Sequence, residues 1–230
     1  NDARIQAFDA ANGKRRWIYQ RSTPSLTLRS SVGIIVTPNG AAAGFPGGKL
    51  VMISLANGTQ VWEATVAQPK GSTELERMAD ITSSPVVAGS NICAVTVGSV
   101  GGKVACFALA SGTQQWARDV SSVGGLDADD KAVYVSNDTG AMLAFDISNG
   151  FNLWKQDKLV NRELSRPLAV GEVVLVGDST GTVHALKRDS GAFAARVSIA
   201  KSAIRAEPQR MGKGIVVQTQ SGEVAALSAE

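Results

Sequence analysis

The sequence contains one histidine, two cysteines and few aromatic residues, and these scarcities exclude several functions at the outset. The single imidazole, His184, cannot build a multi-histidine metal site, and Cys93 and Cys106 do not form the CxxC pair of a zinc site. The net charge of +3 is too small to indicate a nucleic-acid surface. No apolar run approaches the roughly 18 to 20 residues that a membrane-spanning helix needs.

Familiar catalytic and metal-binding motifs are also missing. Asp138 and Asp178 stand in short turns, where an aspartate ordinarily accepts hydrogen bonds from its own backbone. No DxDxDG calcium loop occurs, and GGKVACF at 101–107 lacks the Ser or Thr that a phosphate-binding loop requires. We therefore predict a protein that is not an enzyme and binds no metal or cofactor, with His184 as a core side chain.

An internal repeat organises the whole chain. Its template places a second Gly ten positions after the first and a Trp four positions later, and copies begin at positions 3, 48, 102, 140, 181 and 222. The copy at 3 has Ala for the first Gly, the copy at 181 lacks the Trp, and the copy at 222 is incomplete. Self-similarity at this period is typical of repeat architectures. The repeat residues are Gly13, Gly58, Gly112, Gly150, Gly191, Trp17, Trp62, Trp116 and Trp154.

Each copy predicts a group of short antiparallel strands. The segment between the two glycines is apolar, as in KLVMI at 49–53, and Asn-Gly or Ser-Gly then marks a tight turn. Another β-run precedes the first Gly, such as VVLVG at 173–177, and a strand opened by Pro precedes that run, as in SRPLAV at 165–170. Four strands in about 40 to 45 residues are the pattern of a β-propeller blade.

The predicted fold is all-β: a β-propeller of four-stranded antiparallel blades, with about five to six blades in this chain, as part of an eight-bladed ring. The tryptophans are expected in the core between blades and not on a cofactor platform. Cys93 and Cys106 lie on adjacent strands, where an oxidising compartment would permit a disulfide if they are opposite in register, but we expect free thiols. The single propeller region at 1–230 is divided into a partial blade at 1–22, blades at about 30–66, 83–121, 124–158 and 165–199, and a partial blade at 206–230.

The repeats resemble the quinoprotein-type propeller family, which includes dehydrogenases that hold pyrroloquinoline quinone and calcium, and the non-catalytic BamB scaffolds. The segments TPSLTLRSS at 23–31 and GSTELERMADITSSPVV at 71–87 resemble inter-blade loops of the BamB group, and VLVGDSTGTVHAL at 174–186 resembles a late blade. The resemblance covers the whole chain and corresponds to the carboxy-terminal three-fifths or so of BamB. It implies a scaffold of the outer-membrane β-barrel assembly complex, on the periplasmic face of the Gram-negative outer membrane.

The resemblance also implies a partner surface, because BamB binds the periplasmic POTRA region of BamA through these two loops. The matching positions are Leu26, Leu28 and Arg29 in the first loop and Asp80 in the second. Thr82 stands where the family has a second acidic residue, which weakens the match. Leu26 and Leu28 are spaced by two, so an extended loop would point both to one side. Arg29 could contact carboxylates in bidentate fashion, and Asp80 could either orient Arg29 or meet a cation of the partner.

Several alternatives stay open. The two leucines could pack beneath the propeller, leaving Arg29 and Asp80 as a surface ion pair. The chain could belong to a quinoprotein dehydrogenase, which would need cofactor-stacking Trp, calcium-binding carboxylates and, in many members, vicinal cysteines. It could also be a propeller adaptor for another partner.

Three further expectations concern a membrane anchor, a second binding mode and one local turn. The family is anchored through a lipidated amino-terminal Cys, which this sequence lacks. Strand addition to a blade edge could hold nascent outer-membrane proteins. GSTELER at 71–77 predicts a capped turn, with Ser72 as N-cap or Thr73 paired with Glu76.

Overall fold

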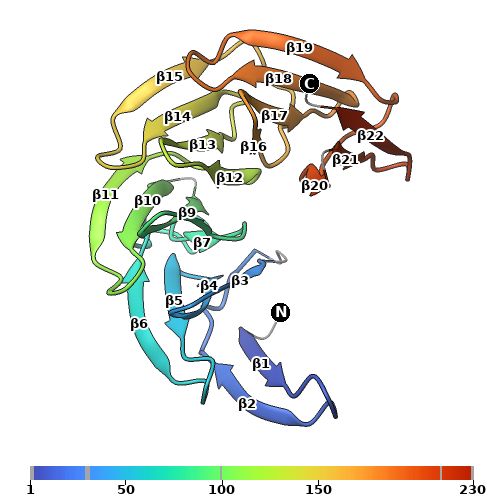
Figure 1. The fold of residues 1–230 in the computed structure, drawn as a ribbon. Coiled ribbons are helices and arrows are strands. Elements are labelled where there is room, and N and C mark those ends of the chain that lie inside the picture. Colours follow the sequence, from blue (N-terminus) through green and yellow to red (C-terminus); the bar gives the residue numbers. More distant parts are fainter. Residues whose placement is uncertain (1–2, 29–31, 99, 213, 229–230) are drawn as a thin grey trace. The chain divides into compact units, whose positions relative to one another are not determined.

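The computed structural model describes residues 3–28, 32–98, 100–212 and 214–228, and every regular element assigned in them is a β-strand (Figure 1). The chain forms two compact units, residues 1–121 and 122–230. Within the described ranges no helix is long and apolar enough to cross a membrane. The prediction of an all-β fold made of antiparallel sheets is confirmed, and three of the six sheets in the described ranges have four strands.

The described part of the first unit contains three antiparallel sheets. The first pairs β1 with β2, the second has the order β3-β4-β5-β6, and the third has the order β11-β10-β9. β9 is paired over its first half with β8 and over its last residues with β7. The strands are β1 (Arg4–Phe8), β2 (Arg15–Gln20), β3 (Ile34–Thr37), β4 (Gly40–Phe45), β5 (Lys49–Ile53), β6 (Gln60–Thr65), β7 (Asp80–Ile81), β8 (Val86–Ala88), β9 (Asn91–Val97), β10 (Lys103–Ala108) and β11 (Gln114–Asp119).

The described part of the second unit also contains three antiparallel sheets, with strands in sequence order. Two have four strands and the last has three. The strands are β12 (Gly125–Ala128), β13 (Ala132–Ser136), β14 (Met142–Asp146), β15 (Asn152–Gln156), β16 (Leu168–Val170), β17 (Val173–Gly177), β18 (Thr182–Lys187), β19 (Phe193–Ser198), β20 (Gln209–Met211), β21 (Gly214–Gln218) and β22 (Val224–Ser228).

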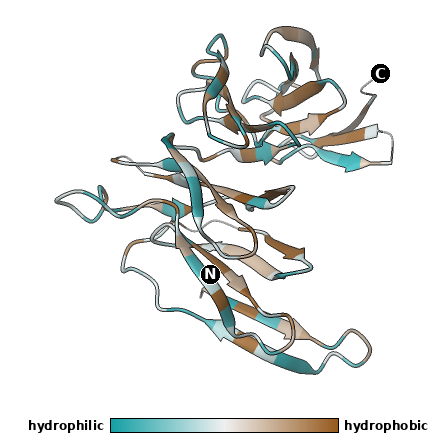
Figure 2. Ribbon diagram, turned by 60° about the vertical axis from the view of Figure 1, so that its left-hand side comes forward, coloured by the Kyte–Doolittle hydropathy of each residue, from teal (hydrophilic) through white to brown (hydrophobic). Residues whose placement is uncertain are grey.

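The cores lie between successive sheets. Strands such as β10 (KVACFA) are apolar on both faces because a sheet packed between neighbours has no solvated face. In the first unit, Leu50 and Met52 of β5 pack with Ile92 of β9 and Phe107 of β10. The core of the second unit repeats this arrangement between its first two sheets. Much of the apolar colouring in Figure 2 accordingly falls on the strands.

Trp17, Trp62 and Trp154 each join their own sheet to the next sheet of the same unit. The Nε1 of Trp62 donates a hydrogen bond of 3.1 Å to the Leu109 carbonyl, and the indole covers Gly112 so closely that a Cβ added to this glycine would lie 2.7 Å from the ring. Trp17 has the same relationship to the turn at Gly58, and Trp154 to the turn at Gly191. The repeat glycine therefore serves its own turn and also makes room for the preceding indole.

Cys93 and Cys106 are joined in a disulfide, so the expectation of free thiols was wrong. The two residues face each other directly in the register of β9 and β10, and both are fully buried. Adjacent antiparallel strands bring directly opposed Cα atoms within reach of a disulfide.

The aspartates at the turns have structural roles. Oδ1 of Asp146 accepts hydrogen bonds from the backbone N–H groups of Ser148 and Asn149, and Asp9 does the same in the first repeat. Asp178 likewise binds its own turn. Asp138 differs, because it accepts a 2.6 Å hydrogen bond from the Val123 N–H of another segment.

Candidate protein-interaction site

Two connectors of the first unit lie against each other: the first connector, residues 21–33 between β2 and β3, and the second connector, residues 66–79 between β6 and β7. The Ser25 hydroxyl donates to Oε1 of Glu74 across them at 3.2 Å. Gly33 packs tightly on the segment that follows β7, since a Cβ added to it would lie 2.1 Å from Oγ of Ser84. The structure thus brings together the two segments that the sequence singled out.

Asp80 connects three segments through one buried carboxylate. Its side chain is 2% exposed; Oδ2 accepts a 2.7 Å hydrogen bond from the Leu28 N–H, and Oδ1 accepts a 2.9 Å hydrogen bond from the Gly47 N–H. β7 holds this carboxylate in place by pairing with β9. These two backbone N–H donors satisfy the carboxylate oxygens that burial removes from water. Asp80 therefore positions the first connector and is not a surface group that could meet a partner's cation.

The two leucines of the first connector differ in exposure. Leu26 is 41% exposed, whereas Leu28 is half-buried and lines a cavity of about 340 Å³ together with Ile5 and Phe45. The leucines are therefore not sealed beneath the sheets. The arrangement places one exposed apolar side chain beside a second that borders a mostly apolar hollow, and a complementary apolar group could pack against both.

The second connector contains a capped turn. Oε2 of Glu76 accepts hydrogen bonds from the N–H groups of Ser72 and Thr73, at 2.7 and 3.0 Å, and the Glu76 N–H donates to Oγ1 of Thr73 at 3.2 Å. These reciprocal bonds form a capping box, so the Thr73–Glu76 alternative is confirmed. The hydrogen bonds from the backbone of Thr73 and Ser72 lower the pKa of Glu76. The capped turn fixes the backbone next to Glu74, which contacts the first connector.

The remaining predicted site residues are less informative. Arg29 lies outside the described residues. Thr82 directly follows β7 and is half-buried, two positions after Asp80 in the chain.

The described residues do not assemble a metal site or a cofactor-stacking platform. Within these ranges no group of three His, Cys, Asp or Glu side chains is placed to hold a metal ion. The indoles of Trp62 and Trp154 are buried and donate to backbone carbonyls. The cysteines are thirteen positions apart in sequence and not vicinal.

A charged cluster in the second unit was not anticipated from the sequence. The fully buried carboxylate of Asp178 accepts hydrogen bonds from the Arg162 guanidinium at 2.7 Å and from Nε2 of His184 at 2.8 Å. Burial by itself would raise the pKa of Asp178, but the hydrogen bonds from His184, Thr180, the Thr182 backbone and Arg162 lower it well below its usual range. Asp178 and His184 were recognised only as turn and core residues, and nothing in the sequence drew attention to Arg162.

Comparison with known protein structures identifies the fold. The sheets and their connectors define a β-propeller protein with blades of the quinoprotein type. Consistent with this, the chain superposes over 98% of its length on 43% of a quinohemoprotein alcohol dehydrogenase from Comamonas testosteroni, with a TM-score of 0.66 and 16% identity, which shows a shared fold alone.

The sequence comparisons identify the family. Residues 1–156 match the family model described as outer membrane protein assembly factor BamB, and the chain belongs to this family. It is 41% identical over 229 residues to a protein of that name from Bordetella pertussis, covering 99% of the chain and 58% of the relative. It superposes on the crystal structure of BamB from Moraxella catarrhalis with a TM-score of 0.90 and 25% identity, over 99% of the chain and 67% of that structure. The chain thus spans about three-fifths of the Bordetella pertussis protein's length.

Proposed function

We propose that the chain is part of a non-catalytic scaffold that supports assembly of outer-membrane β-barrel proteins at the periplasmic face of the outer membrane. Membership of the BamB family carries this proposal. The disulfide between Cys93 and Cys106 supports a location outside the cytoplasm, because structural disulfides persist in oxidising compartments such as the periplasm.

The partner in this proposal is the POTRA region of BamA, bound by the first and second connectors. Leu26 supplies an exposed apolar anchor, and Asp80 holds the backbone of Leu28 so that the anchor is already in place before binding. A pre-ordered loop binds more tightly than a mobile one because less conformational entropy is lost on association. Arg29, next to Leu28 in sequence, would add charge-assisted hydrogen bonds to the partner's carboxylates.

Binding of a purified BamA periplasmic region to the purified protein tests this proposal. The variants Leu26→Ala, Leu28→Ala and Arg29→Glu are compared with Leu55→Ala, in which a leucine of similar exposure (43%) on a turn of the same unit is removed. We expect each connector variant to weaken the Kd by about tenfold, as loss of an interface anchor typically does, and Leu55→Ala to bind normally. Normal binding by all three folded connector variants would rule out this surface.

A further inference from the structure

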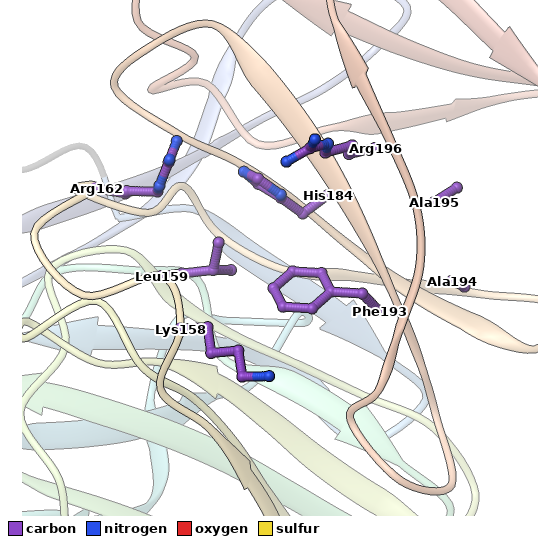
Figure 3. A pocket seen from close by; sticks show the side chains of 8 residues that line it. All are labelled: Lys158, Leu159, Arg162, His184, Phe193, Ala194, Ala195 and Arg196. Carbon is purple, nitrogen blue, oxygen red and sulfur yellow. The ribbon is translucent and has the colours of Figure 1, made fainter.

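A cavity of about 450 Å³ opens in the second unit beside the cluster of Asp178 (Figure 3). It is bordered by the connector between β15 and β16 on one side and by β18 and β19 on the other. Its lining combines three cationic side chains with apolar ones. The lining residues are Lys158, Leu159, Arg162, His184, Phe193, Ala194, Ala195 and Arg196.

Strand register explains why these groups share one side of the sheet. His184 of β18 is directly opposite Arg196 of β19, so both side chains project from the same face. Phe193 projects from this face as well, because its ring packs edge-on against His184 with the centroids 6.0 Å apart. Figure 3 shows Arg162 and Arg196 on either side of His184, and Phe193 and Leu159 between these three residues and Lys158.

The cavity carries an excess of positive charge. Asp178 compensates the charge of Arg162 by direct ion pairing. Lys158 and Arg196 form no ion pair with any acidic group in the described parts of the chain. Two cations next to an apolar surface therefore face the cavity without a counter-charge, and such an arrangement attracts anions.

His184 adds a second, independent observation. Its side chain is 4% exposed, and Nδ1 is buried without a hydrogen-bond partner among the described residues. Because an ionised carboxylate only accepts hydrogen bonds, Nε2 must carry the proton that is donated to Asp178. Nδ1 is then the ring nitrogen left to accept a hydrogen bond from a donor beyond the Asp178 cluster, such as a hydroxyl group of a ligand. Buried polar atoms are nearly always paired in native proteins, so an unpaired one marks a place where a ligand can bind.

We propose that this cavity binds a small anionic group, a carboxylate or a phosphate, that is attached to an apolar body. The anion would lie near Arg196 and Lys158, and the apolar body would pack on Phe193 and Leu159. Arginine and lysine both bind such anions through charge-assisted hydrogen bonds, and an apolar wall favours a ligand with an organic body over inorganic phosphate. The site is distinct from the connectors of the first unit and does not depend on the function proposed for them.

Titration of the purified protein with phenyl phosphate and with phenylacetate tests the site, with benzyl alcohol as the uncharged control. Binding is followed by amide chemical shifts of Ala194, Ala195 and His184. The variants Lys158→Gln and Arg196→Gln are compared with Lys187→Gln, which removes an exposed cation from the same strand as His184 without touching the cavity.

We expect saturable binding of at least one anion, weakened about fivefold or more in Lys158→Gln and Arg196→Gln and unchanged in Lys187→Gln, since each lost cation removes a charge-assisted hydrogen bond. The tighter of the two anions identifies the head group as phosphate or carboxylate. Absence of saturation, equal binding of benzyl alcohol, or undiminished binding in both cavity variants would overturn the proposal.

Discussion

The indole of Trp62 lies directly over Gly112, the turn glycine of the following repeat, and its Nε1 donates to a carbonyl three residues before that glycine. Gly112 also has a φ of +71°, which side-chain-bearing residues rarely adopt. Within each unit, the spacing of glycine and tryptophan in the repeat therefore reflects a contact between successive sheets, because Trp17, Trp62 and Trp154 each pack on the turn glycine of the following copy. The positive φ and the close contact with the indole are two separate reasons why a methyl group at position 112 should destabilise the fold.

The first prediction concerns Gly112→Ala. The left-handed φ costs about 1–2 kcal/mol for a residue with a Cβ, and displacing the indole of Trp62 adds about 1–3 kcal/mol of overpacking. Gly89→Ala is the matched control, because Gly89 has a φ of +57° in the same unit but an added Cβ there would have no atom within 4 Å. Urea unfolding monitored by Trp fluorescence should show the larger loss in Gly112→Ala. Equal losses in the two variants would mean that the indole contact contributes nothing.

The second prediction concerns the disulfide between Cys93 and Cys106. Closing a loop of about this length stabilises a protein by roughly 3 kcal/mol, chiefly through the unfolded chain. The double variant Cys93→Ala/Cys106→Ala should lower the free energy of unfolding by a similar amount, and its stability should not respond to a reductant that weakens the wild type. Thiol titration in denaturant without reductant should find no free cysteine. Two titratable thiols in that assay would contradict the pairing.

The sequence was sufficient to predict the strands and the repeat, and the reasons are local. The strands that begin after Pro85, Pro167 and Pro208 start one residue past each proline, where no ladder hydrogen bond is required of the proline nitrogen. The cysteine pairing was not predictable, because it depends on the register of β9 against β10. A slip of one residue would turn the two side chains to opposite faces, and the sequence of the intervening loop does not fix that register.

The positioning role of Asp80 was equally beyond sequence reasoning. It depends on residues 28, 47 and 80 meeting in the folded unit, and none of these pairs is close along the chain. The same holds for Arg162 and Asp178, sixteen residues apart. In both clusters one buried carboxylate accepts hydrogen bonds from segments that are far apart in sequence. These segments meet only in the folded chain.

The third prediction tests the positioning role of Asp80. Asp80→Ala removes the acceptor of the Leu28 and Gly47 N–H groups, and each buried donor left unpaired costs about 1–3 kcal/mol. Hydrogen–deuterium exchange should become faster at both amides while the exchange of β9 and β10 changes little. Asp119→Ala is the control, because Asp119 is an exposed partner of Lys103 in the same unit. Unchanged exchange at Leu28 in Asp80→Ala would show that the first connector is held by other contacts.

The fourth prediction follows from the lowered pKa of Asp178. A carboxylate with a lower pKa in the folded than in the unfolded chain contributes stability that is complete above the unfolded pKa, near 3.8, and is lost as the pH falls through the folded value. Asp178→Asn leaves Arg162 without its counter-charge, but the Arg162 side chain is 42% exposed and water can solvate it. We therefore expect a loss of about 1–3 kcal/mol, chiefly from the buried hydrogen bonds that the amide cannot accept in full. The difference in unfolding free energy between wild type and variant should be largest near neutral pH and shrink below about pH 4.

Asp146→Asn provides the comparison for this pH profile, because Asp146 is a turn aspartate of the same unit with no ion pair among the described residues. Its effect on stability should be smaller at every pH, since only hydrogen bonds to the turn of Ser148 and Asn149 are altered. A pH-independent difference for Asp178→Asn would show that the carboxylate is not charged in the folded protein. We expect a pH-dependent difference, because Asp178 is fully buried and accepts from the Arg162 guanidinium, His184 and two backbone N–H groups at once. Only an ionised carboxylate can accept all four hydrogen bonds.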